Sequence, residues 1–260
     1  MKIIRDLHSL KQYRSLMTAN TTLGWVPTMG CLHQGHLSLL HTSVNENDCT
    51  ILSVFTNPTQ FNVVSDYENY PKTEQNDLTL AEKADVDVVF IPDETQMYPD
   101  HYQFRVTTTH PDSDIMEGKC RPGHFDGVLT IVMKLLLLIK PTRAYFGEKD
   151  YQQLTLVREL VSAFLMDTEI VACPTIRKSS GLPLSSRLQR LSQDETALAD
   201  QVATIIHAHT EEKIIEHRLA QLGVEIEYIK KYHGRLFIAF KIGPVRFIDN
   251  TAIVNTQHAY

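Results

Sequence analysis

The sequence predicts an α/β fold, in which a doubly wound parallel sheet is followed by a second, smaller α+β domain. Up to residue 173, short β-rich apolar runs alternate with segments of helical periodicity, which is the pattern of a parallel sheet. After Pro174 the pattern changes to two helices and then three short strands separated by glycines. We therefore expect one domain over residues 1–174 and another over 175–260, a division that suits a chain of 260 residues.

Each strand of the first domain is expected where a short run rich in β-branched and aromatic residues stops at a proline or a glycine. Pro58 and Pro92 end two of these runs, because proline cannot continue a strand ladder. Helices are expected where apolar residues recur at three- and four-residue spacing. In chain order, we expect a helix over 3–20, a strand over 23–26, a helix over 37–44, a strand over 49–55, a helix over 74–84, a strand over 85–91, a peripheral strand over 103–107, a helix over 126–139, a strand over 143–147, a helix to about residue 164 and a strand over 169–173.

The second domain begins its helices with a clear start signal. Ser192 and Glu195 have the spacing of a capping box, so a helix is expected from there to about residue 209. A shorter helix over 211–222 should end at Gly223. The remaining short strands are expected over 224–229, 236–240 and 245–248.

Composition argues against several classes of protein. With 43% hydrophobic and 22% charged residues, the chain is neither disordered nor a coiled coil. A formal charge of −6 argues against a surface that coats nucleic acid. The most apolar stretch, residues 128–139, contains Lys134 and is shorter than the roughly 20 residues that a membrane span needs, so we expect a buried helix there. The charged N-terminus is unlike a signal peptide, and the four scattered cysteines form no C-x-x-C pair, so we expect reduced thiols and a cytoplasmic location.

The stretch Val26–Leu37, VPTMGCLHQGHL, is expected to be a strand end, a tight turn and a helix start. His33 and His36 are three residues apart, so on a helix both imidazoles would face one ligand. A helix N-terminus also offers backbone N–H groups and a positive dipole end, which suit a phosphate. Two other interpretations remain open for this pair alone. It could be a corner with two solvated or hydrogen-bonded histidines, or a metal site, although the i, i+4 spacing and central glutamate of a zincin helix are absent.

Other polar residues follow expected strands, where α/β folds place ligands. Asn57 and Gln60 follow the strand over 49–55 and could hydrogen-bond a small polar substrate, although Asn-Pro alone is a turn signal. The loop 117–125 is rich in glycine and positive charge and could deliver Arg121 to an anion, or could simply lead into a helix. The run 148–150 could be a site or a solvated turn. Residues 185–187, Ser-Ser-Arg, could clamp phosphates or form an ordinary cap.

H-x-G-H after a first strand resembles the signature of the nucleotidyltransferase superfamily, and the longer string around it resembles the pantothenate synthetase (pantoate–β-alanine ligase) family. The resemblance runs along the whole length, and its motifs are residues 27–37, 55–61, 70–73, 117–125, 146–153 and 181–187. It implies a Rossmann-like N-terminal domain, a C-terminal lid, a homodimer, and ATP and Mg²⁺ as reactants. It also implies a two-step reaction. Pantoate attacks the α-phosphate of ATP to give pantoyl adenylate and pyrophosphate, and β-alanine then displaces AMP to give pantothenate.

The resemblance also implies roles for individual residues. Phosphates of ATP would be held by His33, His36 and Lys149, the three expected catalytic residues, with Mg²⁺ carried by the phosphates and not directly by the protein. The other expected ATP contacts are Met29, Gly147, Asp150, Ile176, Leu184, Ser185, Ser186 and Arg187. Pantoate would be bound by Gln60, Gln153, Met29, Tyr70 and Asn57, and Arg121 is a further candidate.

The lid motif departs from the family pattern. The family usually has Arg-Glu-x-Asp-Gly-Leu-Ala-Met-Ser-Ser-Arg-Asn, whereas residues 177–188 read RKSSGLPLSSRL. The Glu, the Asp and the Asn of that pattern are lost, Leu184 replaces a residue that packs on adenine, and Thr56 stands where the family commonly has valine. The rival interpretations are another H-x-G-H nucleotidyltransferase and a non-catalytic nucleotide-binding paralogue. We expect small-molecule substrates, and neither nucleic acid nor a membrane as a partner.

Overall fold

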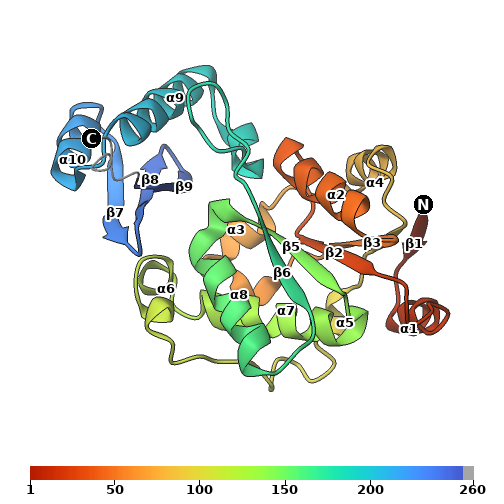
Figure 1. Cartoon of the computed structure of the whole chain (residues 1–260). Helices are drawn as coiled ribbons and strands as arrows, with labels where there is room; N and C mark the ends of the chain where they lie inside the picture. The colour runs from red at the N-terminus through yellow and green to blue at the C-terminus, as the bar shows by residue number, and fades with distance from the viewer. Residues whose placement is uncertain (254–260) are drawn as a thin grey trace, which may run out of the picture. The chain divides into compact units, whose positions relative to one another are not determined.

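The computed structural model describes residues 1–253, which form two compact units (Figure 1). The first comprises Met1–Glu148 and Gln152–Pro174, and the second comprises Lys149–Tyr151 and the chain from Thr175 onward. The last seven residues of the expected second domain, 254–260, lie outside the described part. A parallel sheet with helices in one unit and a small antiparallel sheet in the other confirm the predicted fold class. That each unit is an independent domain stays a prediction.

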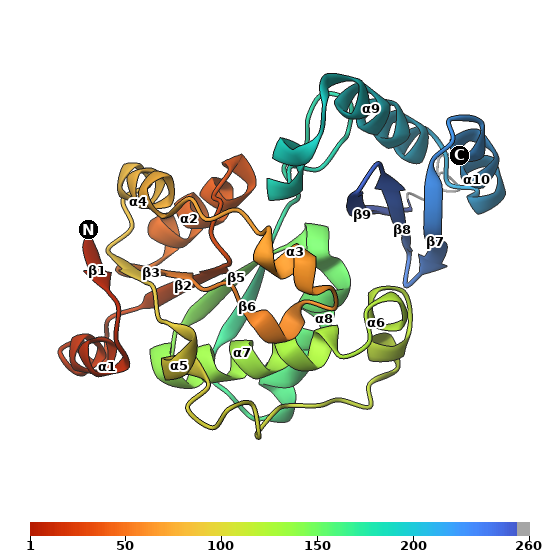
Figure 2. The ribbon, with the colours of Figure 1, turned by 180° about the vertical axis from the view of Figure 1, so that it is seen from behind.

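The sheet of the first unit has six parallel strands in the order β1-β4-β3-β2-β5-β6. Because the chain moves outward from β2 in both directions, the crossover helices cover both faces. Helices α2 and α4 lie on one face, and α1, α7 and α8 lie on the other (Figures 1 and 2). The strands are β1 Lys2–Ile4, β2 Leu23–Thr28, β3 Cys49–Val54, β4 Val88–Phe90, β5 Arg143–Gly147 and β6 Glu169–Cys173.

Two expectations for the first unit were wrong. Residues 3–20 are not one helix: β1 pairs in parallel with β4, and α1 begins only after Asp6, whose carboxylate accepts the Ser9 N–H. The β1 pairing partner lies more than 80 residues away, so local periodicity could not reveal it. Residues 103–107 form no strand, although they alternate, and the Val106 N–H donates to the Thr130 hydroxyl instead of to a sheet.

The helices of the first unit agree closely with expectation where the apolar pattern is long. Helix α7 is almost entirely buried, as expected for the most apolar stretch. Within residues 1–253, the helices all fall short of the length and apolar character that crossing a membrane requires. The helices are α1 Leu7–Ser15, α2 Gln34–Glu46, α3 Val64–Glu68, α4 Glu74–Lys83, α5 Glu94–Met97, α6 Glu117–Cys120, α7 His124–Ile139 and α8 Tyr151–Ala163.

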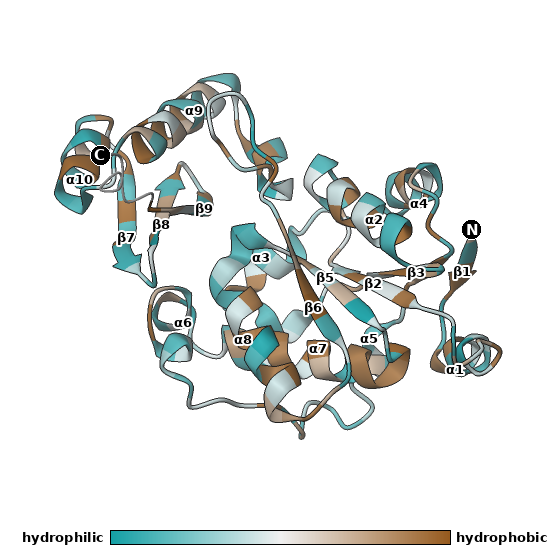
Figure 3. Ribbon diagram, in the orientation of Figure 1, coloured by the Kyte–Doolittle hydropathy of each residue, from teal (hydrophilic) through white to brown (hydrophobic). Residues whose placement is uncertain are grey.

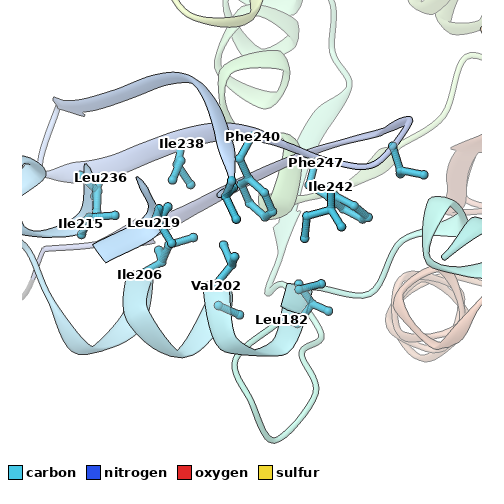
Figure 4. Close-up of a cluster of buried hydrophobic side chains, with 14 residues drawn as sticks. Leu182, Val202, Ile206, Ile215, Leu219, Leu236, Ile238, Phe240, Ile242 and Phe247 are labelled. Atoms are coloured by element: carbon cyan, nitrogen blue, oxygen red, sulfur yellow. The ribbon is translucent and has the colours of Figure 1, made fainter. Parts of the chain in front are cut away.

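The second unit packs two helices, α9 Gln193–Ala208 and α10 Glu212–Gln221, against a three-stranded antiparallel sheet. Along α9 and α10, hydrophobic and hydrophilic residues are interspersed (Figure 3), so each helix can bury one face and leave the other polar. Their apolar faces form a core with the middle strand β8 (Figure 4). The predicted capping box is confirmed, with Ser192 and Glu195 each bonding the other's backbone N–H. The strands, longer than expected, are β7 Glu225–Tyr232, β8 Arg235–Ile242 and β9 Val245–Ala252.

Candidate active site

The histidine pair lies at the N-terminus of α2, immediately after the turn that follows β2. His33 was expected on the helix together with His36. It is instead the N-cap residue, with extended backbone angles. His36 is the third helical residue, and the two rings lie 4.1 Å apart between centroids. The structure therefore brings the two imidazoles together, although by a cap rather than by a shared helix face.

The cap determines which ring nitrogens carry protons. Nδ1 of His33 accepts the Gly35 N–H at 3.1 Å, and Nδ1 of His36 accepts the His33 N–H at 3.3 Å. An accepting nitrogen has no proton, so each ring is neutral and carries its proton on Nε2. Both histidines thus present an Nε2–H donor at a helix N-terminus, which suits a phosphate oxygen.

Gly35, the glycine of H-x-G-H, is required by this packing. A Cβ built on Gly35 would lie 2.8 Å from Cε1 of the His33 ring. Any larger residue would therefore displace the ring.

Gln60 and Met29 meet at the carboxyl ends of β3 and β2, the edge of the sheet where ligands were expected. The Gln60 amide nitrogen donates to the Met29 sulfur at 2.9 Å, and its oxygen accepts from the Asn57 amide at 3.1 Å. Asn57 itself is only 1% exposed. Its amide also donates to the Gly127 carbonyl at 3.1 Å, and its oxygen accepts the Tyr98 hydroxyl at 2.6 Å. Burial raises the pKa of that hydroxyl, so Tyr98 remains a proton donor. The Asn57 carboxamide thus uses both its donor nitrogen and its acceptor oxygen in hydrogen bonds within the protein.

Arg121 and His124 both hydrogen-bond to the backbone of Gln60. Nη2 of Arg121 and Nδ1 of His124 donate to the Gln60 carbonyl oxygen at 3.0 and 2.8 Å. Because a carbonyl can only accept, the His124 proton is on Nδ1, and its Nε2 accepts from Arg121 at 3.1 Å. In this structure the glycine-rich loop brings Arg121 to the Gln60 carbonyl and to within 3.7 Å of the Glu117 carboxylate, and its delivery to a substrate anion stays a prediction.

Tyr70 and Gln153 are the remaining expected pantoate residues. The Tyr70 ring is buried and packs edge-on against Phe61, with centroids 5.7 Å apart. Gln153 lies half-buried in the first turn of α8. Its neighbour Gln152 is a structural residue, accepting the Glu117 N–H at 3.1 Å and donating to the Ile115 carbonyl at 2.9 Å.

Lys149 and Asp150, grouped with the second unit, form a short 3₁₀ turn directly after Gly147, the last residue of β5. The Lys149 ammonium lies 3.6 Å from the Asp150 carboxylate. Its backbone carbonyl accepts the Asn250 side-chain amide at 2.9 Å, and Asn250 is itself held by Arg235 at 2.8 Å. Strand β9 therefore fixes the backbone that carries Lys149.

The lid motif forms a tight loop within the second unit. The Leu184 N–H donates to the Ile176 carbonyl at 3.0 Å, so these two expected ATP residues lie side by side. The Ser185 hydroxyl accepts the Arg187 N–H at 3.2 Å, and Ser186 is buried. Ser185 is thus the N-cap of a short 3₁₀ turn, and whether the motif also clamps phosphates stays a prediction.

Three supporting residues escaped the sequence-based interpretation: Asp77, His124 and Asn250. Asp77 carries two hydrogen bonds from the turn before His33, and its only sequence signal is a threonine four residues earlier. His124 was visible within a glycine-rich motif, but nothing local marked its partner. Asn250 had no signal, because its bond to Lys149 spans about 100 residues.

Comparison with known proteins identifies the family. A family model described as pantoate-beta-alanine ligase matches residues 2–252. The chain belongs to the pantoate–β-alanine ligase family.

Members of this family resemble the chain over nearly its whole length. The pantothenate synthetase of Legionella pneumophila is 48% identical over 250 residues, covering 96% of this chain and 99% of the relative. That of Coxiella burnetii is 48% identical over 249 residues, with 96% of each chain covered. A solved pantoate–β-alanine ligase of Francisella tularensis, complexed with beta-gamma ATP and β-alanine, has a TM-score of 0.95 and 42% identity and covers 97% of this chain and 98% of its own. The pantothenate synthetase of Thermus thermophilus has a TM-score of 0.89 and 34% identity, with 97% and 99% covered.

Proposed function

We propose that the chain joins pantoate to β-alanine with ATP, through a pantoyl adenylate, and releases AMP and pyrophosphate. Membership of the pantoate–β-alanine ligase family supports the overall ligation and makes the chain an enzyme of the carbon–nitrogen ligase class. The ATP and β-alanine named for the Francisella relative support the same substrates here. The observation that carries the two-step route is the pair of Nε2–H donors at the start of α2.

The first step needs positioning and charge neutralisation rather than a covalent enzyme intermediate. A pantoate carboxylate oxygen attacks the α-phosphorus, and the bond to the β-phosphate oxygen breaks as pyrophosphate leaves. His33 and His36 would donate to the phosphate oxygens whose negative charge grows, and Lys149 would add a full positive charge. Donors aimed at developing charge are the largest single source of rate enhancement in such sites.

Pantoate is proposed to lie beside Gln60, Gln153 and Met29. Neutral carboxamides can bind its hydroxyls and carboxylate without the strong positive field that would weaken the carboxylate as a nucleophile. Because the Asn57 side chain is buried and committed to the protein, we propose that Asn57 holds the Gln60 carboxamide and does not touch pantoate. Tyr70, packed on Phe61, would close the same pocket.

The remaining ATP contacts are proposed for Gly147, for Asp150 and for residues in the stretch 176–187. Gly147 and Asp150 would contact the ribose, Ile176 and Leu184 the adenine, and the Ser-Ser-Arg run at 185–187 the triphosphate. Excluding water matters here, because the mixed anhydride would otherwise hydrolyse. In the second step the β-alanine amine attacks the acyl carbon, AMP leaves, and the amine gives up a proton.

Magnesium is proposed to arrive with ATP. Its ligands would be phosphate oxygens of ATP, because Mg²⁺ prefers oxygen ligands and is commonly bound through substrate phosphates. The ion would neutralise phosphate charge. A homodimer and a cytoplasmic location are also proposed, the latter in keeping with four cysteines that, within the described residues, form no disulfide.

The first test is pyrophosphate release with ATP, Mg²⁺ and pantoate, with and without β-alanine. The proposal requires release that depends on pantoate and turns over repeatedly only when β-alanine is present. Release without pantoate would point to another nucleotidyltransferase. ATP binding without release would point to a non-catalytic paralogue.

A pair of histidines on the same helix gives a matched test of the donor role. His36→Ala should slow adenylation by about 10²–10³, the usual cost of removing one donor to developing charge. His41→Ala, an exposed position further along α2, should leave the rate unchanged. Near-normal pyrophosphate release by His36→Ala would contradict the role.

A further inference from the structure

The turn that leads into the histidine pair has an unusual backbone. Gly30 and Cys31 both have positive φ, at 83° and 54°. A residue with a side chain, such as Cys31, reaches this left-handed region only at a cost, so surrounding contacts must hold it there. The next residue, Leu32, directly precedes His33.

Asp77 supplies those contacts. Its Oδ2 accepts the Cys31 N–H at 2.9 Å, and its Oδ1 accepts the Leu32 N–H at 2.8 Å. The Thr73 hydroxyl, one helical turn earlier, lies 3.1 Å from both oxygens. Asp77 is only 3% exposed, and its partners among the described residues are two backbone N–H groups and one hydroxyl.

The arrangement is specific for a carboxylate. Two consecutive N–H groups need two acceptor oxygens side by side, whereas an asparagine would offer one oxygen and turn an NH₂ donor towards the other N–H. The fit is also close, because a Cβ on Gly30 would lie 3.0 Å from the Asp77 Oδ2. Asp77 therefore determines the path of the backbone at the two residues before the N-cap of α2.

We infer that Asp77 is the positioning residue of the histidine pair. By holding the Cys31–Leu32 turn, it presents His33 at the cap, where the Gly35 N–H selects the Nε2–H tautomer. Asp77 touches no substrate in this assignment and acts through His33. The inference rests on the proposed function only in taking the Nε2–H groups of the two histidines to bind ATP phosphate.

A double-mutant cycle in the full-length protein separates positioning from general stability. Asp77→Asn should slow pantoate-dependent pyrophosphate release by about 10- to 100-fold, one or two factors of ten for a misplaced donor, with the pantoate KM unchanged. The double variant with Asp77→Asn and His33→Ala should be less than about threefold slower than His33→Ala alone, because effects that act through one residue are not additive. Rate losses that multiply would overturn the inference.

Asp48 provides a matched control at the opposite end of the same strands. It accepts the Thr22 N–H at 2.8 Å and the Thr22 hydroxyl at 2.7 Å, just before β2 and β3 begin. Asp48→Asn removes the same kind of bond, so it should lower stability comparably or less while leaving the rate within about twofold. An equal rate loss in Asp48→Asn would mean that the effect of Asp77→Asn is general.

An NMR readout tests the inference without relying on activity. The side-chain nitrogen resonances of His33 should report protonated Nε2 in the wild type and should shift in Asp77→Asn but not in Asp48→Asn. If Asp77→Asn does not fold, Thr73→Val, which removes only the hydroxyl donor, should shift the same resonances by a smaller amount. Unmoved His33 resonances would overturn the inference. Wild-type protein that releases no pyrophosphate would instead overturn the proposed function and leave the NMR result to decide the role of Asp77.

Discussion

Replacing Arg121 tests whether the glycine-rich loop serves pantoate or ATP. The structure places the Arg121 guanidinium on the Gln60 carbonyl, beside His124, and so links it to a residue that we propose to bind pantoate. Arg121→Met should therefore raise the pantoate KM and leave the ATP KM unchanged. An arginine that binds ATP phosphate would give the reverse.

The size of the effect follows from the contacts. A hydrogen bond from a charged donor contributes about 1.5–3 kcal/mol to stability or binding. The Arg121 side chain is 20% exposed, which favours the lower end, and His124 still donates to the same carbonyl at 2.8 Å. A loss of about 1.4 kcal/mol corresponds to a tenfold change in an equilibrium constant, so the pantoate KM should rise by up to about tenfold. Arg121→Lys keeps a positive charge near Glu117 but loses the forked geometry, so it should fall between Arg121→Met and the wild type.

Initial rates of pyrophosphate release, measured while pantoate and ATP are varied in turn, give both constants. Arg143→Met is the matched control, because Arg143 also donates to a backbone carbonyl, that of Glu46 at 3.0 Å, but at the amino end of β5. It should change neither KM. A raised ATP KM with an unchanged pantoate KM in Arg121→Met would refute the assignment of Arg121 to Gln60.

Three further outcomes are expected. Arg177→Met should lower stability by up to about 3–5 kcal/mol, because it removes the guanidinium partner of the Asp249 carboxylate, which is 2% exposed and keeps the Asn250 N–H and His207 as neighbours. Calorimetry should show most of that loss recovered when Asp249→Leu is added, and no recovery would contradict a penalty from buried charge. Thiol labelling of the native protein at pH 8 should modify the exposed Cys120 alone, since the other three cysteines are buried and burial raises the pKa of the Cys173 thiol to about 11; rapid labelling of more than one thiol would contradict this burial. Gly35→Ala should push the His33 ring aside and slow pyrophosphate release while the protein stays folded by circular dichroism, and an unchanged rate would argue against the packing of Gly35 on His33.

Local patterns were sufficient to predict the elements that carry the histidine pair. The run from β2 through the turn to α2 contains its own signals, an apolar strand, a proline and glycine turn and a leucine-rich helix. The capping box at Ser192 was likewise read correctly, because both of its partners lie within one helical turn. His33 was placed inside the helix because histidine is not among the common N-cap residues.

Contacts between residues far apart in sequence could not be predicted in the same way. Asp77 bonds a turn about 45 residues earlier, and strand β1 pairs with β4 more than 80 residues later. The strand predicted over residues 103–107 was wrong for the opposite reason. These residues have strand-like alternation but, in the described chain, pair with no neighbouring strand. Arg121 was recognised as a candidate, yet only the fold shows that its partner is the Gln60 carbonyl.

The altered lid motif bears on the rival interpretation of a non-catalytic paralogue. That interpretation assumes that losing the two acids and the asparagine of the family motif loosens the loop. In the structure, however, the positions that replaced the Glu and Asp of the motif, Lys178 and Ser180, both bond Asp200 of α9, at 3.3 and 2.6 Å. The acid is therefore supplied by a neighbouring helix instead of by the loop itself. Arg177 adds a two-pronged ion pair to Asp249 of β9, so the segment before Ser185 is anchored on both sides, and the sequence change alone is no reason to expect a disabled lid.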